Sequence, residues 1–465
     1  MNENQRRELL NEKKSGWLET SDEKFGQIFD FCNGYMEFLN RSKTEREFAA
    51  NAKNIAEANG FRDVTKLDSL KAGDKVYFVN REKSIYFAVI GEEKLENGLH
   101  IVGAHIDSPR LDLKPNPLYE DSELSLMETH YYGGVKKYQW VTIPLALHGV
   151  VVKKDGTKID VVVGEEETDP VVMVSDLLVH LASEQQQKKA TEVIAGEDLN
   201  ILVGSMHLEG EEKEAVKANI LKLLKEKYDF EEEDFMSAEI EIVPAGKARD
   251  LGLDRSMVAG YGHDDRICAY TSLLALLETE SVKKTSVVLL VDKEEVGSIG
   301  ATGMQSRFFE NAVAELMDRV GEYSELKLRR ALANSKMLSS DVTAAFDPNY
   351  AGAYEKKNSA FFGKGLAFAK YTGARGKSGC NDANAEFVAW LRNVMDENDV
   401  AYQMAELGKV DQGGGGTIAY ILAEYGMEVI DCGVALQNMH APWEVASKVD
   451  IFETMRGYKA FLMAE

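Results

Sequence analysis

Apolar segments alternate with helical segments in the C-terminal half of the chain, and this pattern constrains the fold more than any other feature. TSVVLLVD at residues 285–292 and GMEVIDCGV at residues 426–434 are apolar runs of the kind that a buried strand requires. Residues 265–279 and 383–397 have the apolar spacing of helices. Strands that alternate with helices form a mostly parallel sheet covered by helices. We therefore predict an α/β fold.

The middle of the chain has a different pattern, which predicts an inserted domain. It contains a hairpin signal at 145–166 with a turn at Asp155-Gly156, helix-like stretches at 172–189 and 210–227, and the strand AEIEIVP. Because single cores stop growing at roughly 250–300 residues, 465 residues suggest two domains. We expect a catalytic domain from residues 1–114 and 248–465, and a smaller β-rich domain from residues 115–247.

Before this insertion, residues 43–60 read as a helix that Gly60 ends, and KVYFVNREKSIYFAVIG reads as a β-hairpin. The formal charge of −24 would repel nucleic acid and anionic membranes, so neither is an expected partner. The first residues lack the apolar core of a secretory signal, and no apolar run is long enough to span a membrane. With four dispersed cysteines, these features indicate a cytoplasmic protein with reduced thiols.

Candidate metal ligands stand at predicted strand ends. His105 and Asp107 lie two residues apart in LHIVGAHIDSP, so the alternation of a strand places them on one face. The histidine could bind a metal while the aspartate accepts the other ring N–H of the histidine and so fixes its tautomer. TSVVLLVD continues directly into Glu294 and Glu295, at the edge where open α/β sheets bind ligands. One carboxylate of this pair could bind a metal while the other moves protons.

Three further candidates follow the same logic. Asp264 and Asp265 open a predicted helix, Asp341 follows the apolar run MLSS, and His440 lies just beyond VIDCGVAL. Each alone has a structural explanation, such as a helix cap for the two aspartates. The carboxylates and histidines together are too many for one tetrahedral site, so we predict two metal ions per chain.

These residues lie in motifs that resemble the aspartyl aminopeptidase family of dinuclear zinc exopeptidases. HIDSPRLDLKP is similar to the family's H-x-D-S-P…K-P segment, and YGGVKKYQWVTIPLALHGVVV to its Y-G-G…W…L…G-x-V segment. DLLVHL, LNILVGS, DKEEVGS, SSDVTAAFDPNY, DQGGGGTI and NMHAPWE follow in the family's order. The pieces H-x-D-S-P and P-N-Y distinguish this family from other dinuclear peptidases.

The resemblance implies a zinc exopeptidase fold and a role for each candidate. It implies one ion held by His105, Asp264 and Asp341, and a second held by Glu295, His440 and the same Asp264 as a bridge. Glu294 would be the general base and Asp107 the partner of His105. The resemblance favours zinc, although carboxylate and imidazole ligands also suit cobalt and manganese.

The resemblance further implies a homo-oligomer, commonly a tetrahedral dodecamer, assembled through the inserted domain. His180 in DLLVHL matches a family histidine that reaches an active site from that domain. Lys364 in FFGKGLAF matches a family K-G pair and is our candidate for binding an acidic N-terminal side chain. The chain departs from the family at Trp140–Leu145 and at Gly414–Gly416. Acidic and neutral specificities therefore both stay open.

The expected function is release of single N-terminal residues from peptides with free N-termini. Two ions would activate a bridging hydroxide, and Glu294 would take the proton of the attacking water and pass it to the leaving amine. A metal-dependent deacylase or carboxypeptidase on the same scaffold is the alternative enzyme. A non-catalytic metal-binding shell protein is the alternative outside enzymes, but Glu294, which no ligand role requires, argues against it.

Overall fold

The computed structural model describes residues 9–10, 15–18 and 20–465, and its largest sheet has nine strands. In spatial order these strands are β1 (Arg62–Asp63), β2 (Lys75–Asn80), β3 (Ser84–Val89), β14 (Ser286–Val291), β4 (His100–His105), β15 (Lys336–Ser340), β19 (Glu428–Gly433), β17 (Leu366–Ala369) and β18 (Tyr402–Met404). The central strands β14, β4, β15 and β19 are parallel to one another. The predicted mostly parallel sheet is confirmed.

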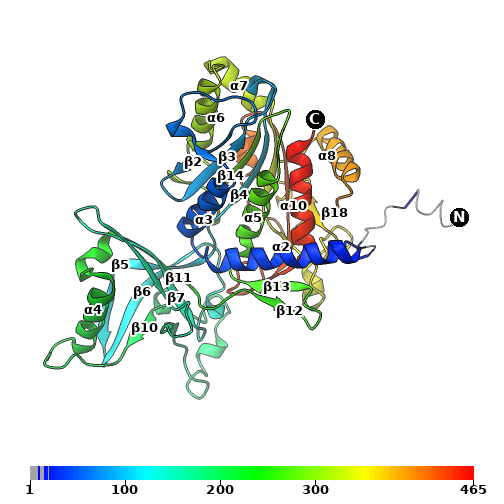
Figure 1. The fold of residues 1–465 in the computed structure, drawn as a ribbon. Coiled ribbons are helices and arrows are strands. Elements are labelled where there is room, and N and C mark those ends of the chain that lie inside the picture. The colour runs from blue at the N-terminus through cyan, green and yellow to red at the C-terminus, as the bar shows by residue number, and fades with distance from the viewer. Residues whose placement is uncertain (1–8, 11–14, 19) are drawn as a thin grey trace.

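Helices cover both faces of this sheet, as Figure 1 shows. One face packs on α2 (Asp22–Asn40), α3 (Glu45–Ala58), α5 (His263–Leu277), α8 (Ala385–Glu397) and α10 (Lys448–Met463). The other packs on α6 (Phe308–Arg319), α7 (Glu325–Ala333) and α9 (Ala419–Ala423). Successive residues of β14 alternate between the two cores: Leu289 belongs to one and Leu290 to the other. This is why its sequence is apolar throughout.

A second sheet draws all seven of its strands from residues 110–244 and projects away from the first (Figure 1). In order they are β8 (Lys158–Val163), β7 (Leu145–Val152), β11 (Ala238–Pro244), β5 (Arg110–Asp121), β6 (Leu124–Tyr132), β10 (Ile201–Gly204) and β9 (Met173–Val174). All of its pairings are antiparallel, and α4 (Ala215–Tyr228) packs against it. β5 runs through the expected boundary at residue 115.

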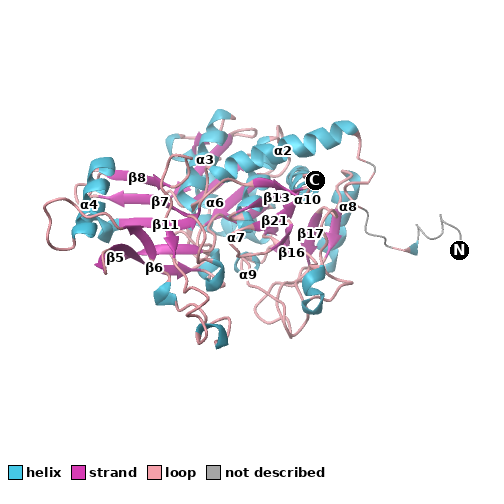
Figure 2. Ribbon diagram, turned by 90° about the horizontal axis from the view of Figure 1, so that it is seen from below, coloured by secondary structure: helices cyan, strands magenta, loops and turns pink. Residues whose placement is uncertain are grey.

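A third sheet of five short strands was not predicted from the sequence. It contains β12 (Arg249–Leu251), β13 (Met257–Gly260), β21 (Glu444–Ser447), β20 (Ala435–Gln437) and β16 (Thr343–Ala344). In the view of Figure 2, β13, β21 and β16 are seen near β17 of the first sheet. The pair Gly260↔Glu444 joins β13 to β21. The sheet therefore brings the start of α5 next to the segment that carries His440.

The prediction of a helix at 172–189 is wrong. This segment contains the two-residue strand β9, turns and a single 3-10 turn, η4 (Gln185–Gln187). A helix in a folded protein is stabilised mainly by burying an apolar face. Here Leu178, Val179 and Leu181 are all more exposed than buried, so no such face is covered within one chain.

Two sequence expectations concern the chain as a whole. Within the part of the chain that the structure describes, no helix combines the length and apolar character needed to cross a bilayer. The four cysteines are free thiols, and Cys32, Cys268 and Cys432 are buried.

A buried polar cluster joins the first two sheets. The Lys43 ammonium, just before α3, lies 2.5 Å from Glu165 Oε1 and donates to the carbonyl oxygens of Pro244 and Gly246 at 2.8 and 2.9 Å. The side chain of Lys43 is only 4% exposed. A buried lysine is tolerated only when its charge is paired in this way.

We predict that Lys43→Met destabilises the protein, because Glu165 and two carbonyl groups would lose their buried partner. Removing one member of a buried ion pair costs about 3–5 kcal/mol. Unfolding in urea measures this loss. Lys53→Met is the matched control and should lose at most about 1 kcal/mol, since Lys53 forms an exposed pair with Glu57 on α3 and a contact with the Tyr77 ring at 5.8 Å. Equal stability of the two variants would contradict the prediction.

Candidate metal centre

The ends of three adjacent parallel strands form the base of the site. β14, β4 and β15 lie side by side, so their carboxyl ends meet at one edge of the sheet. His105 is the last residue of β4, Asp341 follows β15, and Glu294 and Glu295 stand in η7 (Glu294–Val296) just after β14. Ligands of open α/β sheets bind at such edges.

Asp264 connects two histidines at the centre of the site. Its Oδ1 lies 3.1 Å from His105 Nε2 and its Oδ2 lies 3.1 Å from His440 Nε2. Asp264 comes from the first turn of α5, and His440 from the loop between β20 and β21. A carboxylate that offers one oxygen to each side has the arrangement of a bridging ligand.

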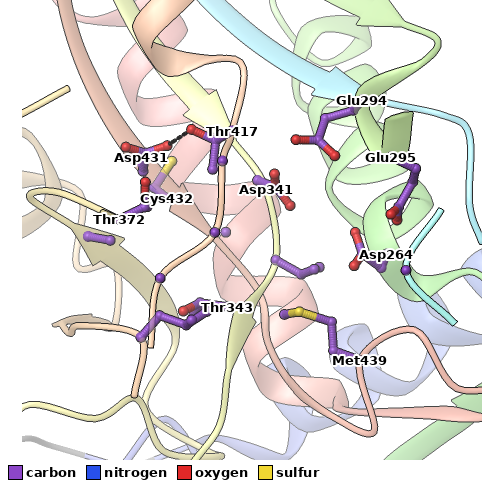
Figure 3. Close-up of a pocket in the computed structure, with 18 of the residues that line it drawn as sticks. Asp264, Glu294, Glu295, Asp341, Thr343, Thr372, Thr417, Asp431, Cys432 and Met439 are labelled. Carbon is purple, nitrogen blue, oxygen red and sulfur yellow. Dashed lines mark hydrogen bonds between the residues drawn. The ribbon is translucent and has the colours of Figure 1, made fainter. Parts of the chain in front are cut away.

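The remaining carboxylates divide between the two histidines. Asp341 Oδ1 is 3.8 Å from His105 Nε2, and Glu295 Oε2 is 3.5 Å from His440 Nε2. Asp264, Glu295 and His440 each offer a ligand atom, and these atoms lie within 4.8 Å of one another. His105 forms similar groups with Asp265 and Asp341 and with Glu294 and Glu295. Figure 3 shows the carboxylates of Asp264, Glu294, Glu295 and Asp341 around one space.

The donor set fits divalent metal ions. Imidazole nitrogens and carboxylate oxygens are the ligands that zinc accepts besides thiolate. Glu295 Oε1 is buried and has no hydrogen-bond partner among the described residues. Both carboxylate oxygens of Asp265 are likewise buried and have no hydrogen-bond partner among the described residues. Buried unpaired carboxylate oxygens are costly, and a cation beside them would offset that cost.

The electrostatics of the protein alone lead to the same conclusion. Burial and the negative charges of Asp341 and Asp264 raise the pKa of Glu294 to about 8. Burial lowers the pKa of His440, but its hydrogen bond to Asp264 and the charge of Glu295 outweigh burial and raise the value to about 10. The centre therefore takes up protons to reduce repulsion among its carboxylates, and metal cations could replace those protons.

Two buried acids orient the candidate ligands. Asp107 Oδ1 is 3.3 Å from His105 Nδ1, whose other neighbour is the Asp107 carbonyl at 3.1 Å. Both neighbours are acceptors, so Nδ1 carries the proton and Nε2 is left free for a metal. Glu444 accepts the backbone N–H groups of His440 and Asp264 at 2.8 and 3.1 Å. Sequence reasoning missed Glu444, although it lies in the NMHAPWE motif.

The backbone is strained where it presents these ligands. Lys293 has φ +73° and His440 has φ +66°, in the left-handed region that residues other than glycine seldom adopt. Lys293 turns the chain at the end of β14, so Glu294 and Glu295 face the site. Strain of this kind persists where the surrounding structure holds it, commonly at functional sites.

A cavity of about 570 Å³ extends from the metal centre. Asp264, Glu294, Glu295, Asp341 and His440 line one end of it. The rest of its lining is mostly small and apolar, and includes Ala367, Ala369, Leu407, Gly414, Gly415, Gly416 and Met439. No lysine or arginine is among the described residues that line it. Away from the metal centre, a negatively charged ligand would therefore meet no lysine or arginine among the described residues that line the cavity.

One further acid lies at the wall of this cavity. Asp431 of β19 accepts a hydrogen bond from the Thr417 hydroxyl at 2.6 Å, drawn as a dashed line in Figure 3. Burial raises the pKa of Asp431 to about 7. The contact fixes the loop that carries Gly414–Gly416, where the chain departs from the expected family pattern. Sequence reasoning missed this residue, because an acid inside an apolar strand gives no sign of its partner.

The structure does not bring the remaining two candidates to the cavity of the same chain. His180 lies in an exposed turn within the segment between β9 and β10 of the second sheet. Lys364 stands between Gly363 and Gly365, whose N–H groups bind the buried carboxylate of Asp450 at 2.8 and 2.7 Å. Neither lines the cavity. Their proposed contacts with substrate stay predictions.

Comparison with known proteins gives consistent matches over the whole length. The family described as aminopeptidase I zinc metalloprotease (M18) matches residues 38–462. A probable M18 family aminopeptidase 1 of Clostridium acetobutylicum is 64% identical over 460 residues, covering 98% of this chain and 99% of the relative. A protein of the same description from Thermotoga maritima is 48% identical over 453 residues, covering 97% and 99%.

Comparison with solved structures leads to the same family. The crystal structure of aminopeptidase I from Clostridium acetobutylicum superposes with a TM-score of 0.92 at 61% identity and covers 98% of this chain and 100% of that one. The M18 aminopeptidase of Thermotoga maritima gives a TM-score of 0.94 at 47% identity, covering 97% and 99%. The more distant mApe1 of S. cerevisiae, whose structure is described as a dodecamer, has a TM-score of 0.75 at 19% identity, covering 94% and 97%.

Proposed function

The chain belongs to the M18 family of aminopeptidases, and we propose that it releases single N-terminal residues from peptides at a centre of two divalent metal ions. The observation that carries this proposal is the position of Asp264, whose two oxygens lie 3.1 Å from His105 Nε2 and from His440 Nε2. The family is one of zinc metalloproteases. Zinc is therefore our first choice of metal, and cobalt or manganese would suit the same ligands.

Each ion would have its own ligands and share Asp264. His105 and Asp341 would complete one site, and Glu295 and His440 the other. When bound, the two ions would supply Lewis-acid activation of a water and of the scissile carbonyl group. Asp107 would keep His105 in the tautomer that leaves Nε2 available, and Glu444 would hold the backbone of His440 and Asp264 in place.

Glu294 is our candidate for the general base. Its carboxylate lines the cavity and lies 3.9 Å from His105 Nε2, while Glu295 is nearer to His440 and more deeply buried. From this position Glu294 could accept a proton from the attacking water and return it to the leaving amine. In the protein without metal, burial and the charges of Asp341 and Asp264 raise the pKa of Glu294 to about 8, a direction that suits a group that must hold a proton during the reaction.

The charge of the cavity favours an aminopeptidase over the alternative enzymes. A carboxypeptidase must bind a substrate carboxylate, and no lysine or arginine lines the cavity among the described residues. An aminopeptidase instead binds a free N-terminal amine, whose nitrogen, once deprotonated, could bind one of the two proposed metal ions. A deacylase remains the rival, and an N-acetylated peptide separates the two, because an aminopeptidase would leave it uncut.

The same lining supports an uncharged first residue rather than an acidic one. The cavity walls beyond the metal centre are formed mostly by small and apolar residues, with the hydroxyl groups of Thr343, Thr372 and Thr417 and the Asp431 carboxyl among them. A substrate carboxylate would lose its hydration there without gaining a cationic partner. We therefore propose that the enzyme prefers substrates with a neutral N-terminal residue. Lys364 was the candidate for binding an acidic side chain, so a variant at Lys364 tests this preference.

We also propose a homo-oligomer, formed through the second sheet. Leu177, Leu178, Val179 and Leu181 are between 46% and 67% exposed in one chain. Clustered exposed apolar residues commonly mark an interface between proteins. The distant mApe1 is a dodecamer, which makes a dodecamer the favoured size. His180 lies within this segment, so assembly could carry it toward the cavity of a neighbouring copy.

The catalytic proposal predicts different effects for the two adjacent glutamates. Glu294→Gln should retain both metal ions and lose turnover by about 10²-fold or more, because the proton acceptor is gone. Glu295→Gln should instead weaken one ion, because a ligand is lost. Elemental analysis and kinetics on both variants decide between these roles. Near-normal turnover in Glu294→Gln would rule out its role as base.

The substrate proposal predicts that Leu-anilide is cleaved with a higher kcat/KM than Asp- or Glu-anilide, by roughly tenfold or more. Burying the substrate carboxylate without a cationic partner would cost about 1–3 kcal/mol or more. This cost is the reason for the expected difference in kcat/KM. The ranking should be unchanged in Lys364→Ala. A preference for acidic substrates that disappears in this variant would restore Lys364 as the specificity residue.

The assembly proposal predicts a mass several times that of the 51.7 kDa chain in light scattering. Val179→Glu should reduce this mass, because it places a charge in the proposed interface. Leu326→Glu is the control: Leu326 is 57% exposed, but it lies on α7, far from the second sheet in Figure 1. A stable, active wild-type monomer would refute the proposal.

A further inference from the structure

The turn Tyr132–Gly133–Gly134 carries the second sheet into the metal centre. Tyr132 is the last residue of β6, and it pairs with Arg110, the first residue of β5. β5 begins a few residues after His105 ends β4. Strand pairing in the second sheet therefore places Tyr132 next to the segment that carries Asp107.

The first contact of this turn reaches the His105 side of the centre. The Tyr132 hydroxyl donates a hydrogen bond to Asp107 Oδ2 at 2.7 Å. Asp107 also accepts the backbone N–H groups of Glu294 and Glu295, both at 3.2 Å, and contacts His105 Nδ1. Asp107 thus orients one metal ligand and the turn that holds two catalytic carboxylates. Tyr132 is the only side chain besides His105 that hydrogen-bonds the carboxylate of Asp107 among the described residues.

The ring of Tyr132 is itself held firmly. The guanidinium of Arg110 lies 3.9 Å from the ring centroid and the ammonium of Lys293 lies 5.4 Å from it. Burial and the negative charge of Asp107 raise the pKa of Tyr132 far above its usual range. The hydroxyl therefore keeps its proton near neutral pH and can donate to Asp107.

The second contact reaches the His440 side. The carbonyl oxygen of Gly134 lies 2.9 Å from His440 Nδ1. A carbonyl can only accept, so Nδ1 must carry the proton, and Nε2 is left facing Asp264 at 3.1 Å. This is the same selection of tautomer that Asp107 performs for His105. One turn of three residues thus acts on both halves of the centre.

The two glycines are required for this close approach. Gly133 has φ +74°, and a Cβ there would lie 3.2 Å from Glu295 Oε2. A Cβ on Gly134 would lie 3.2 Å from His440 Nδ1. Either methyl group would press against a candidate metal ligand. Glycine permits both the backbone conformation and the contact.

We propose that Tyr132 and Gly134 are positioning residues through which the second sheet sets the metal affinity of the centre. Tyr132 acts on one ion through Asp107 and His105, and Gly134 acts on the other through His440. The inference rests on the proposed function, since it requires the two metal sites. It assigns to the second sheet a part in metal binding that is separate from any part in assembly.

Zinc titration of metal-free protein against a competing chelator tests the proposal. Tyr132→Phe keeps the ring but removes the donor, and should weaken zinc binding by about 10- to 100-fold, as expected for the loss of a partner beyond the direct ligands. Tyr131→Phe is the matched control. Tyr131 is the preceding residue of β6, is 42% exposed, and should bind zinc like wild type.

Gly134→Ala tests the other half of the centre. At a zinc concentration that saturates wild type, this variant should hold one ion per chain instead of two. Gly352→Ala, at a glycine where a Cβ would meet nothing within 4 Å, should hold both. Each metal-free variant should remain folded at the temperature of the titration, although the lost hydrogen bond to the buried Asp107 should lower the unfolding temperature of Tyr132→Phe.

The outcomes separate the inference from the function on which it rests. Wild-type affinity in both Tyr132→Phe and Gly134→Ala would overturn the inference while leaving the two-metal proposal intact. Weaker zinc binding in variants whose metal-free form is already unfolded at the temperature of the titration would also overturn it, since the residues would then be structural. A wild-type protein that takes up no zinc would overturn the proposed function and the inference with it.

Discussion

Repulsion among buried carboxylates is the constraint on which the site depends. Glu294, Glu295 and Asp341 converge because parallel strands end at one edge of the sheet, and the first turn of α5 adds Asp264 to them. Burial and the neighbouring acids together raise the pKa of Glu294 to about 8, and the contribution of the acids is a consequence of this repulsion. Divalent cations would remove it, so the arrangement is costly without metal and stable with it.

The orientation of the two histidines depends on partners that arrive from elsewhere in the chain. Asp107 fixes the tautomer of His105 from the loop after β4, and the Gly134 carbonyl fixes that of His440 from the second sheet. Glu444, on the third sheet, holds the backbone of both His440 and Asp264. Strand ends of the nine-stranded sheet thus supply His105, Glu295 and Asp341. The first turn of α5 supplies Asp264, and the loop between β20 and β21 of the third sheet supplies His440.

Local patterns predicted the elements that carry the chemistry, since the strand ends at His105, Glu294 and Asp341 follow from apolar runs and their length. Sequence patterns did not predict the parts of the structure that depend on contacts between residues distant in the sequence. The apolar residues at 172–189 read as a helical face, but within one chain they have nothing to pack against. The third sheet is built from strands of two to four residues, which are too short to leave a periodic signal. Tyr132 contacts Asp107, 25 residues earlier, and Glu444 contacts Asp264, 180 residues earlier, so these roles could not be predicted from local patterns.

The most direct test of the two-metal account is to add zinc stepwise to metal-free protein and to follow Leu-anilide hydrolysis and bound zinc in the same samples. The bridging position of Asp264 predicts that hydrolysis reaches its maximum as the second ion per chain binds, and that chelation abolishes it. Full hydrolysis by metal-free protein, or by protein that holds a single ion per chain, would contradict the account.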